Sequence, residues 1–278
     1  MSTAYHDHTL SLRGLNFHYL DWGTAGRPPF VLLHGGAQTA HSWDDFAPVV
    51  RADYHVYALD QRGHGDSDWA ADGDYTRHTQ AEDVAAFVAE RGIAPHLLAG
   101  LSMGGINAIT YTARYPERVR ALIIVDVGPE IEQQGQENIQ GFVGIDALDS
   151  FEAFVERAHG FNPRRSLDNL RQRLSHNLKQ LPSGQWTWKF DQTRRGSGSM
   201  RSSLKPEELW QDVGTIGCPT LIVRGGESDI LSPAAATRLQ AAIPDSRLAV
   251  VPGAGHSVMG DNPDGFAAAV QAFLQSLG

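Results

Sequence analysis

The chain has 278 residues, of which 41% are hydrophobic and 20% are charged. A chain of this kind can bury a sizeable core, either as one large α/β domain or as two small ones. Its formal net charge of -9 argues against nucleic acid or an anionic membrane as the main partner. The single cysteine, Cys218, excludes an internal disulfide and a cysteine-based metal site.

The N-terminal stretch shows neither a basic start nor an apolar segment, so no signal peptide is expected. No run approaches the roughly 18 apolar residues that a membrane-spanning helix needs. We therefore expect a cytoplasmic protein that acts on a small-molecule substrate, with neither nucleic acid nor membrane as a partner. The composition leaves a homodimer open.

Short apolar runs alternate with amphipathic segments along most of the chain. The strands expected from these runs are, in chain order, His8–Gly14, Asn16–Trp22, Phe30–Leu33, Tyr54–Leu59, His96–Gly100, Val119–Val127, Pro219–Arg224 and Arg247–Val251. The helices expected from the apolar spacing are Ser42–Val50, Thr79–Glu90, Ile106–Ala113, Pro233–Ala242 and Phe266–Leu277. Continuous apolar strands alternating with helices predict an α/β fold, with an eight-stranded, mostly parallel sheet covered by helices on both faces.

The strand pattern stops between Glu130 and about Gly214. Two amphipathic helices are expected there, over Ser150–His159 and Leu167–Leu178, and aromatic residues are scattered between and after them. We interpret this region as a helical insertion over one end of the sheet. The predicted organisation is a core over residues 1–128 and 216–278, interrupted by a helical cap over residues 129–215.

The segment around Ser102 carries the clearest chemical signal. Gly100-Leu101-Ser102-Met103-Gly104 follows an apolar strand and precedes a helix, which is the context of a nucleophile elbow. The two glycines give room for a sharp turn that holds the serine in a strained backbone conformation. The helix that follows directs its N-terminal amides towards any anion formed beside the serine. Ser102 is therefore the predicted nucleophile.

A serine hydroxyl needs a base within hydrogen-bond reach, and the base needs a carboxylate to orient it. Of the 12 histidines, His256 is the best candidate for the base, because it lies in a glycine-lined loop after the last strand. Asp229, in the loop after the preceding strand, is the first choice for the acid. Asp126 stays open as the alternative, because it ends the strand next to that of the serine.

The oxyanion formed during acyl transfer needs preorganised N–H donors. One is expected from the amide of Met103, directly after the nucleophile. The other is expected from the loop that begins at His34, with Gly36 as first choice and Ala37 as second. No metal and no cofactor are expected.

Together these motifs resemble the cap-bearing, single-domain branch of the α/β-hydrolase superfamily. The matching segments are His34-Gly35-Gly36, Asp60-Gln61-Arg62-Gly63-His64-Gly65-Asp66-Ser67, Gly100–Gly105, Gly226–Asp229 and Gly255-His256. The resemblance implies a serine hydrolase that cleaves a small carboxylic ester or lactone through an acyl-enzyme on Ser102. Two alternatives stay open: a hydrolase of C–C bonds in a vinylogous diketone, and a non-catalytic ligand-binding protein. A serine nucleophile argues against the dehalogenases and epoxide hydrolases, which use aspartate.

The insertion is expected to set specificity, as apolar walls usually do in ligand sites. The candidate pocket residues are Phe142, Phe161, Trp186, Trp188 and Val258. An equally good interpretation is that the cap aromatics pack a small core of their own. The pairs Arg164-Arg165 and Arg194-Arg195 are candidates for a substrate carboxylate, although such pairs are more often solvated surface.

Overall fold

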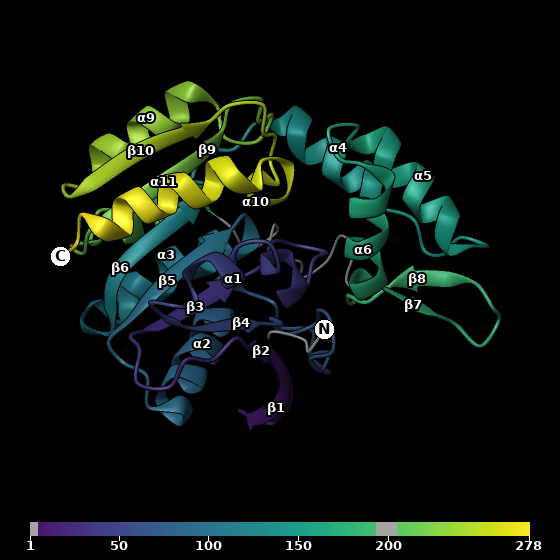
Figure 1. Ribbon diagram of the computed structural model, residues 1–278, viewed down its shortest axis with the longest axis horizontal. Helices are drawn as coiled ribbons and strands as arrows, with labels where there is room; N and C mark the ends of the chain where they lie inside the picture. The colour runs from purple at the N-terminus through teal and green to yellow at the C-terminus, as the bar shows by residue number, and fades with distance from the viewer. Residues whose placement is uncertain (1–4, 193–204) are drawn as a thin grey trace.

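An eight-stranded sheet runs through the molecule, with helices on both of its faces (Figure 1). The computed structural model describes residues 5–192 and 205–278. The strand order is β1-β2-β4-β3-β5-β6-β9-β10, and only the pairs β1–β2 and β2–β4 are antiparallel. The strands are β1 (His6–Leu12), β2 (Leu15–Asp21), β3 (Pro29–Leu33), β4 (His55–Leu59), β5 (His96–Leu101), β6 (Val119–Val125), β9 (Thr220–Gly225) and β10 (Ser246–Val251). The predicted fold class is confirmed.

Alternate residues of the central strands feed two separate hydrophobic clusters. In β3, Val31 and Leu33 belong to the cluster on one face, whereas Phe30 and Leu32 belong to the cluster on the other. Helices α2 (Arg77–Arg91), α3 (Met103–Arg114), α8 (Pro206–Val213) and α9 (Pro233–Ala242) close the first face. The second face is closed by η1 (Ala40–Trp43), α1 (Ala47–Val50), α10 (Val258–Asp261) and α11 (Pro263–Gln275). This alternation is the period-two pattern of pleated strands buried on both sides.

The helix predicted over Ser42–Val50 is in fact two short pieces, η1 and α1. Pro48 lies at the start of α1 and has no backbone N–H, so it cannot donate to the carbonyl four residues earlier. A continuous helix through this segment would lose that bond. The predicted apolar face is buried, but the proline divides the helix.

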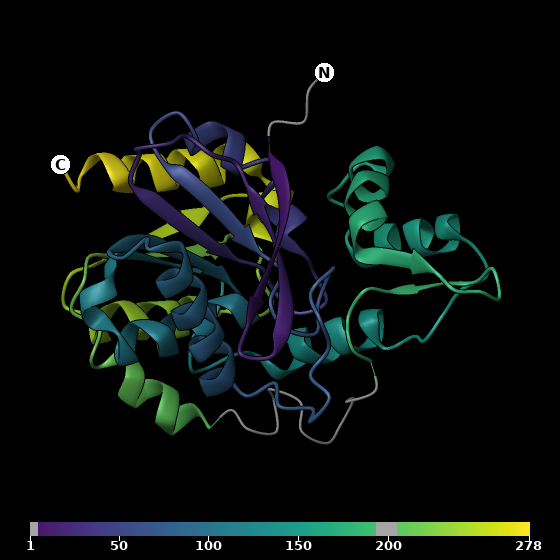
Figure 2. The same cartoon turned by 90° about the horizontal axis from the view of Figure 1, so that it is seen from below.

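The cap lies over one end of the sheet (Figures 1 and 2). It contains α4 (Gln133–Val143), α5 (Phe151–Phe161), α6 (Leu167–Asn177) and a hairpin of β7 (Leu178–Gln180) and β8 (Trp186–Trp188). The cap has its own hydrophobic cluster, in which Phe154, Leu174 and Trp188 are almost fully buried. The predicted helical insertion is present, and the short hairpin was not predicted, because strands of three residues are too short to show an alternating pattern.

Helix α8 falls inside the predicted cap but packs with the core. Its Leu209 and Val213 are fully buried in the cluster that also holds Ile109 of α3. The predicted cap boundary at residue 215 therefore lies too late by one helix. The sequence shows that α8 has an apolar face, but it does not show whether that face packs with the cap or with the core.

Close backbone contacts fix the point where β5 passes into α3. A Cβ built on Gly100 would lie 2.2 Å from the carbonyl oxygen of Gly104, and one built on Gly104 would lie 2.4 Å from that of Leu33. Both distances are far inside van der Waals contact with backbone atoms, which cannot move away as a side chain could. The start of α3 can therefore rest on the ends of β5 and β3 only if both positions are glycine.

We expect Gly100→Ala to lower the free energy of unfolding by about 3 kcal/mol, the upper range for overpacking a buried site. Urea unfolding followed by circular dichroism measures this. Gly141→Ala is the matched control, since a Cβ at that helical position meets nothing within 4 Å. Equal stability of the two variants would contradict the packing account.

Among the residues that the structure describes, no helix is long and apolar enough to cross a membrane.

Candidate active site

Ser102 lies between β5 and α3 in a conformation that side chains rarely adopt, with φ 52° and ψ -116°. Such a conformation costs about 1–3 kcal/mol and persists only where the surroundings enforce it. Here its amide donates to the carbonyl of Val125, and its own carbonyl accepts from the amide of Ile106. These two bonds and the glycine contacts hold the turn, and Ser102 faces a large cavity.

His256 pairs with Asp126, not with Asp229. The distance from His256 Nδ1 to Asp126 Oδ2 is 2.8 Å, and the Asp126 side chain is fully buried. Asp229 is exposed and accepts a hydrogen bond from Asn138 Nδ2 of α4, at 3.0 Å. The prediction of Asp229 as the orienting acid was therefore wrong, and the alternative, Asp126, occupies that place.

The surroundings of Asp126 explain why this carboxylate can be buried. It follows β6 with a φ of 51°, which turns its side chain towards the neighbouring strand β9. The amide of Gly225 donates to Oδ1 at 3.0 Å, and the hydroxyl of Ser228 donates to Oδ2. Buried charges need such partners. The sequence analysis did not identify Ser228, although it lies in the Gly226–Asp229 motif, because the next residue, Asp229, was the predicted acid.

The loop after β3 lies beside the nucleophile. A Cβ built on Gly36 would be 4.0 Å from the Cβ of Met103, and both residues line the cavity together with Ser102. Ala37 follows with a φ of 61°. The structure thus brings the two expected oxyanion donors, Gly36 and Met103, to the same place as the serine.

His34 holds this loop as a neutral ring. Its Nε2 accepts from the amide of Gln61 at 3.0 Å, so its Nδ1 carries the proton and donates to the carbonyl of Gly35 at 2.7 Å. Burial lowers the pKa of His34 below its ordinary value. Burial, with the neighbouring His34, also lowers the pKa of His64 to about 4. The rings of His34 and His64 are therefore uncharged, and neither adds a fixed positive charge beside the loop after β3 at neutral pH.

Asp60 ties this loop to the rest of the core. It accepts from the amides of Ala40 at 2.6 Å and Asp66 at 3.0 Å, and it pairs with His18 Nδ1 at 2.8 Å. Burial alone would raise the pKa of Asp60, but the bond from His18 holds it below its ordinary value. Burial would lower the pKa of His18, but the bond to Asp60 raises it.

These shifts predict a stability window. The lowered pKa of Asp60 gives stability that is present above about pH 4 and is lost as the pH falls through the folded value. The raised pKa of His18 gives stability that is complete below about pH 6.5 and is lost as the pH rises through the folded value. The destabilisation caused by Asp60→Asn should therefore be largest between these limits. Unfolding midpoints across pH measure it, with the exposed Asp229→Asn as control; an unchanged difference at every pH would contradict the assignment.

A cavity of about 1120 Å³ lies between the core and the cap. Ser102 and His256 line it from the core, and the predicted pocket residues Phe142, Phe161 and Trp188 line it from the cap. Two predicted pocket residues lie elsewhere. Trp186 packs against Phe151 within the cap, and Val258 is fully buried in a core cluster. Both side chains pack in hydrophobic clusters instead of lining the cavity, Trp186 against that of the cap and Val258 in one of the sheet.

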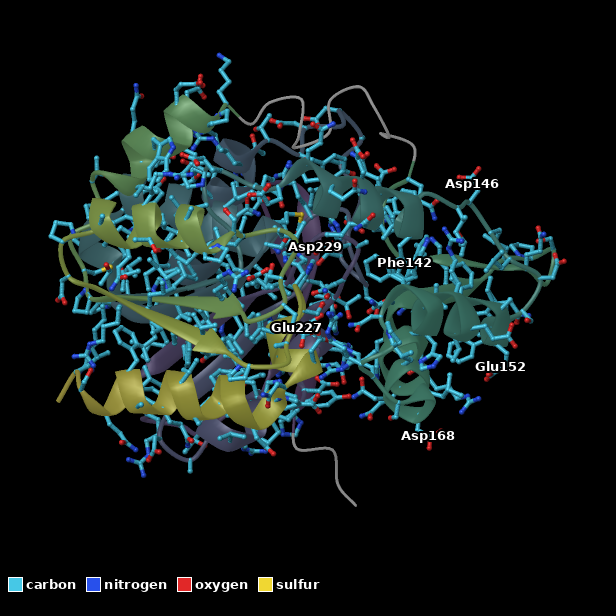
Figure 3. The ribbon with its side chains drawn as sticks, turned by 90° about the horizontal axis from the view of Figure 1, so that it is seen from above. Phe142, Asp146, Glu152, Asp168, Glu227 and Asp229 are labelled. Atoms are coloured by element: carbon cyan, nitrogen blue, oxygen red, sulfur yellow. The ribbon has the colours of Figure 1, made fainter. Side chains whose placement is uncertain are left out.

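The arginines that line this cavity already have acidic partners. Arg164 pairs with Glu227 at 2.7 Å, Arg165 with Asp261 at 2.8 Å, and Arg173 with Asp45. Figure 3 shows Glu227 and Asp229 on the core side and Phe142 on the cap side of this region. The pair Arg194-Arg195 lies outside the described residues. Neither Arg164 nor Arg165 is therefore an unpaired cation that could bind a substrate carboxylate.

Comparison with known proteins places this geometry in a family. The family model described as "alpha/beta hydrolase fold" matches residues 28–263. The chain belongs to this family. The α/β-hydrolase is 31% identical to the esterase Rv0045c of Mycobacterium tuberculosis, over 92% of this chain and 86% of that protein. The crystal structure of that esterase superimposes with a TM-score of 0.79 and 28% identity, over 99% of this chain and 92% of the other.

A second relative is a 2-hydroxy-6-oxononadienedioate/2-hydroxy-6-oxononatrienedioate hydrolase of Klebsiella pneumoniae. It is 28% identical to this chain, over 94% of this chain and 92% of the relative. The relatives thus include esterases and C–C bond hydrolases.

Two matched substitutions separate the acids. Replacing Asp126 by Asn removes the charge that orients and stabilises His256, so kcat for p-nitrophenyl acetate should fall by about 10⁴-fold, as when the acid of such a triad becomes an amide. Asp229→Asn should leave kcat close to that of the unaltered protein, because the Asp229 carboxylate bonds to Asn138 and His256 bonds to Asp126. The reverse ranking of the two variants would restore Asp229 as the acid.

Proposed function

We propose that this α/β-hydrolase is a serine hydrolase that cleaves an uncharged carboxylic ester through an acyl-enzyme on Ser102. The observation that carries the proposal is the 2.8 Å hydrogen bond between His256 and the buried Asp126, with His256 lining the same cavity as a serine held in a strained turn. A lactone is an ester whose alcohol stays attached, and the same residues serve it.

The proposed reaction follows from the tautomer of His256. With the Nδ1 proton held by Asp126, Nε2 is free to accept the proton of the Ser102 hydroxyl as its oxygen bonds to the acyl carbon. The resulting oxyanion lies towards the amides of Gly36 and Met103, which would stabilise it. His256 then gives its proton to the leaving alcohol. In the second half, His256 takes a proton from water as the water oxygen attacks the acyl carbon. His256 then gives that proton to the Ser102 oxygen as the acyl–oxygen bond breaks, which releases the carboxylic acid.

The charges on the cavity wall favour an uncharged substrate. The charged lining residues are three arginines, Arg164, Arg165 and Arg173, and four acids, Asp191, Glu227, Asp229 and Asp261. The arginines have the acidic partners described above, so the net charge of the wall is not positive. A dianionic substrate would have to displace one of these ion pairs before it could gain a cation.

The cap supplies an apolar surface for the acyl or alcohol group. The rings of Phe142 and Phe161 stack with centroids 4.5 Å apart and planes inclined by 7°, and Trp188 meets Phe142 edge-on at 5.4 Å. All three line the cavity. An aromatic wall of this kind suits an apolar ester group better than a strongly hydrated one.

The likeness to the dienedioate hydrolase favours a second candidate function, hydrolysis of a C–C bond in a vinylogous diketone. The same serine, base and amides would carry it. Such a substrate bears carboxylates, which the paired arginines do not readily accommodate. A non-catalytic binding protein is the third candidate, and it would leave Ser102 unactivated.

The test compares the unaltered protein with Ser102→Ala. We expect the unaltered protein to hydrolyse p-nitrophenyl acetate and to be labelled by a fluorophosphonate, and Ser102→Ala to lose the label and at least about 10³-fold of the rate. Ser257→Ala, which removes another serine of the cavity wall, should keep both properties.

The alternatives predict different results. Turnover of a dienone while simple esters are ignored would favour the C–C hydrolase. A Ser102 that takes no label and turns over neither substrate class would favour the binding protein.

A further inference from the structure

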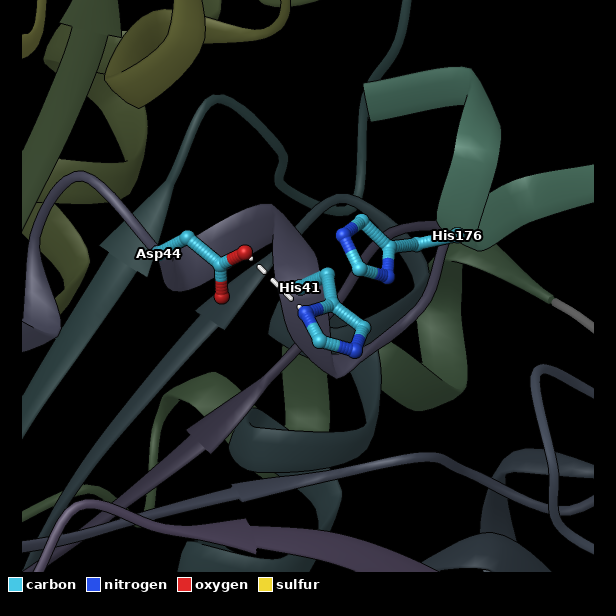
Figure 4. Close-up of side chains that lie close together, drawn as sticks. All are labelled: His41, Asp44 and His176. Carbon is cyan, nitrogen blue, oxygen red and sulfur yellow. Dashed lines mark hydrogen bonds and ion pairs between the residues drawn. The ribbon is translucent and has the colours of Figure 1, made fainter. Parts of the chain in front are cut away.

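Three side chains with metal-binding chemistry gather where the cap meets the core, outside the catalytic triad. His41 belongs to η1, Asp44 follows η1, and His176 lies in the last turn of the cap helix α6. One ligand atom from each lies within 4.8 Å of the other two. Figure 4 shows that both rings present a nitrogen on the side that faces the Asp44 carboxylate.

The three groups are only partly satisfied by other contacts. His41 Nδ1 pairs with Asp44 Oδ2 at 3.0 Å, but Asp44 Oδ1 is buried and has no hydrogen-bond partner among the described residues. His176 stacks on His41 with ring centroids 3.5 Å apart, and no hydrogen bond of its ring occurs in the described part of the chain. A buried carboxylate oxygen without a partner is costly, and a cation would satisfy it.

The spacing suits a small divalent ion. Metal–nitrogen and metal–oxygen bonds of about 2.0–2.2 Å place ligand atoms no more than about 4 Å apart. The present span of 4.8 Å is wider, and the rings of His41 and His176 are stacked with planes inclined by 19°, so metal binding requires one ring to rotate out of the stack until both nitrogens point at the ion. Two imidazoles and one carboxylate form a donor set typical of zinc, cobalt, nickel and copper rather than of magnesium or calcium.

The electrostatic surroundings do not oppose a cation. Arg173 lies one turn before His176 on α6, but its guanidinium pairs with Asp45 and also donates to the carbonyl of His41. Lys189, whose positive charge also acts on His176, pairs with Asp66. Because Asp45 and Asp66 offset these two cations, Asp44 leaves one negative charge for the incoming metal. A second group of three potential ligands among the described residues is already engaged by the bonds described above; it consists of His18, Asp60 and Asp66.

We propose that His41, Asp44 and His176 form a binding site for a divalent transition metal, with zinc as the best fit, which ties the cap helix α6 to the core. The site does not depend on the proposed esterase chemistry. Because Arg173, Leu174 and Asn177 of α6 line the catalytic cavity, a metal at this position fixes one wall of that cavity. Asn177 also bonds to Thr39, which directly precedes η1, so the metal reinforces an existing contact.

The test is a calorimetric titration of the full chain, freed of metal by a chelator, with Zn²⁺. We expect one ion per chain, and a midpoint of thermal unfolding that rises with Zn²⁺ concentration, because the ion binds the folded state. His176→Asn should weaken binding by at least about tenfold, since losing even a supporting partner of a ligand costs that much.

The matched control is His8→Asn. His6 and His8 are exposed, neighbouring histidines, with rings 6.4 Å apart, so an adventitious surface site would use them. Loss of binding in His8→Asn with retention in His176→Asn would overturn the proposal, as would the absence of binding in the unaltered protein.

Electron paramagnetic resonance of the Cu²⁺-loaded His8→Asn protein gives a second readout, because this variant lacks one ring of the adventitious pair. Hyperfine coupling to two imidazole nitrogens supports the site, and coupling to one or none contradicts it.

Discussion

The approach of α3 to the ends of β3 and β5 is the constraint on which the catalytic geometry depends. Gly100 and Gly104 allow backbone atoms to meet at distances that any side chain would forbid. That contact leaves Ser102 no relaxed conformation, and the bonds to Val125 and Ile106 hold it in the strained one. The strain is thus held by the packing of the sheet and its helix, which fixes the position of the Ser102 side chain beyond the strand ends.

Two buried carboxylates, Asp60 and Asp126, organise the loops around this serine. Each accepts bonds from backbone amides of another segment and from a histidine. A buried carboxylate is stable only when several donors converge on it, so each acid fixes the segments that supply those donors. Asp60 therefore secures the loop after β3 through Ala40. Asp126 secures the loop that carries Ser228, and the same carboxylate also bonds to His256.

The cap is joined to the core mainly by polar contacts. Ion pairs link Arg164 to Glu227, Arg165 to Asp261 and Lys189 to Asp66. The cap's hydrophobic cluster stays separate from the two clusters of the sheet. The ion pairs also occupy the arginines of the cavity, so the same contacts that seat the cap shape the charge that a substrate meets. The proposed metal site would add one further link to this junction.

The sequence by itself determined the elements whose signals are local. Apolar strands alternating with helices specified the sheet, and the glycines around Ser102 specified the turn, because strand burial and backbone sterics act within a few residues. The glycine-lined loop likewise pointed to His256. Only the tertiary structure decided which acid faces that histidine. Asp126 and Asp229 follow the neighbouring strands β6 and β9, so both loops end at the same sheet edge, and only the direction of each side chain separates them. For the same reason the sequence could not assign α8 to the core, exclude Trp186 and Val258 from the cavity, or bring His41 and His176 together. Each of these depends on which of several apolar or polar surfaces a residue meets, and that choice is made by packing between segments far apart in the chain.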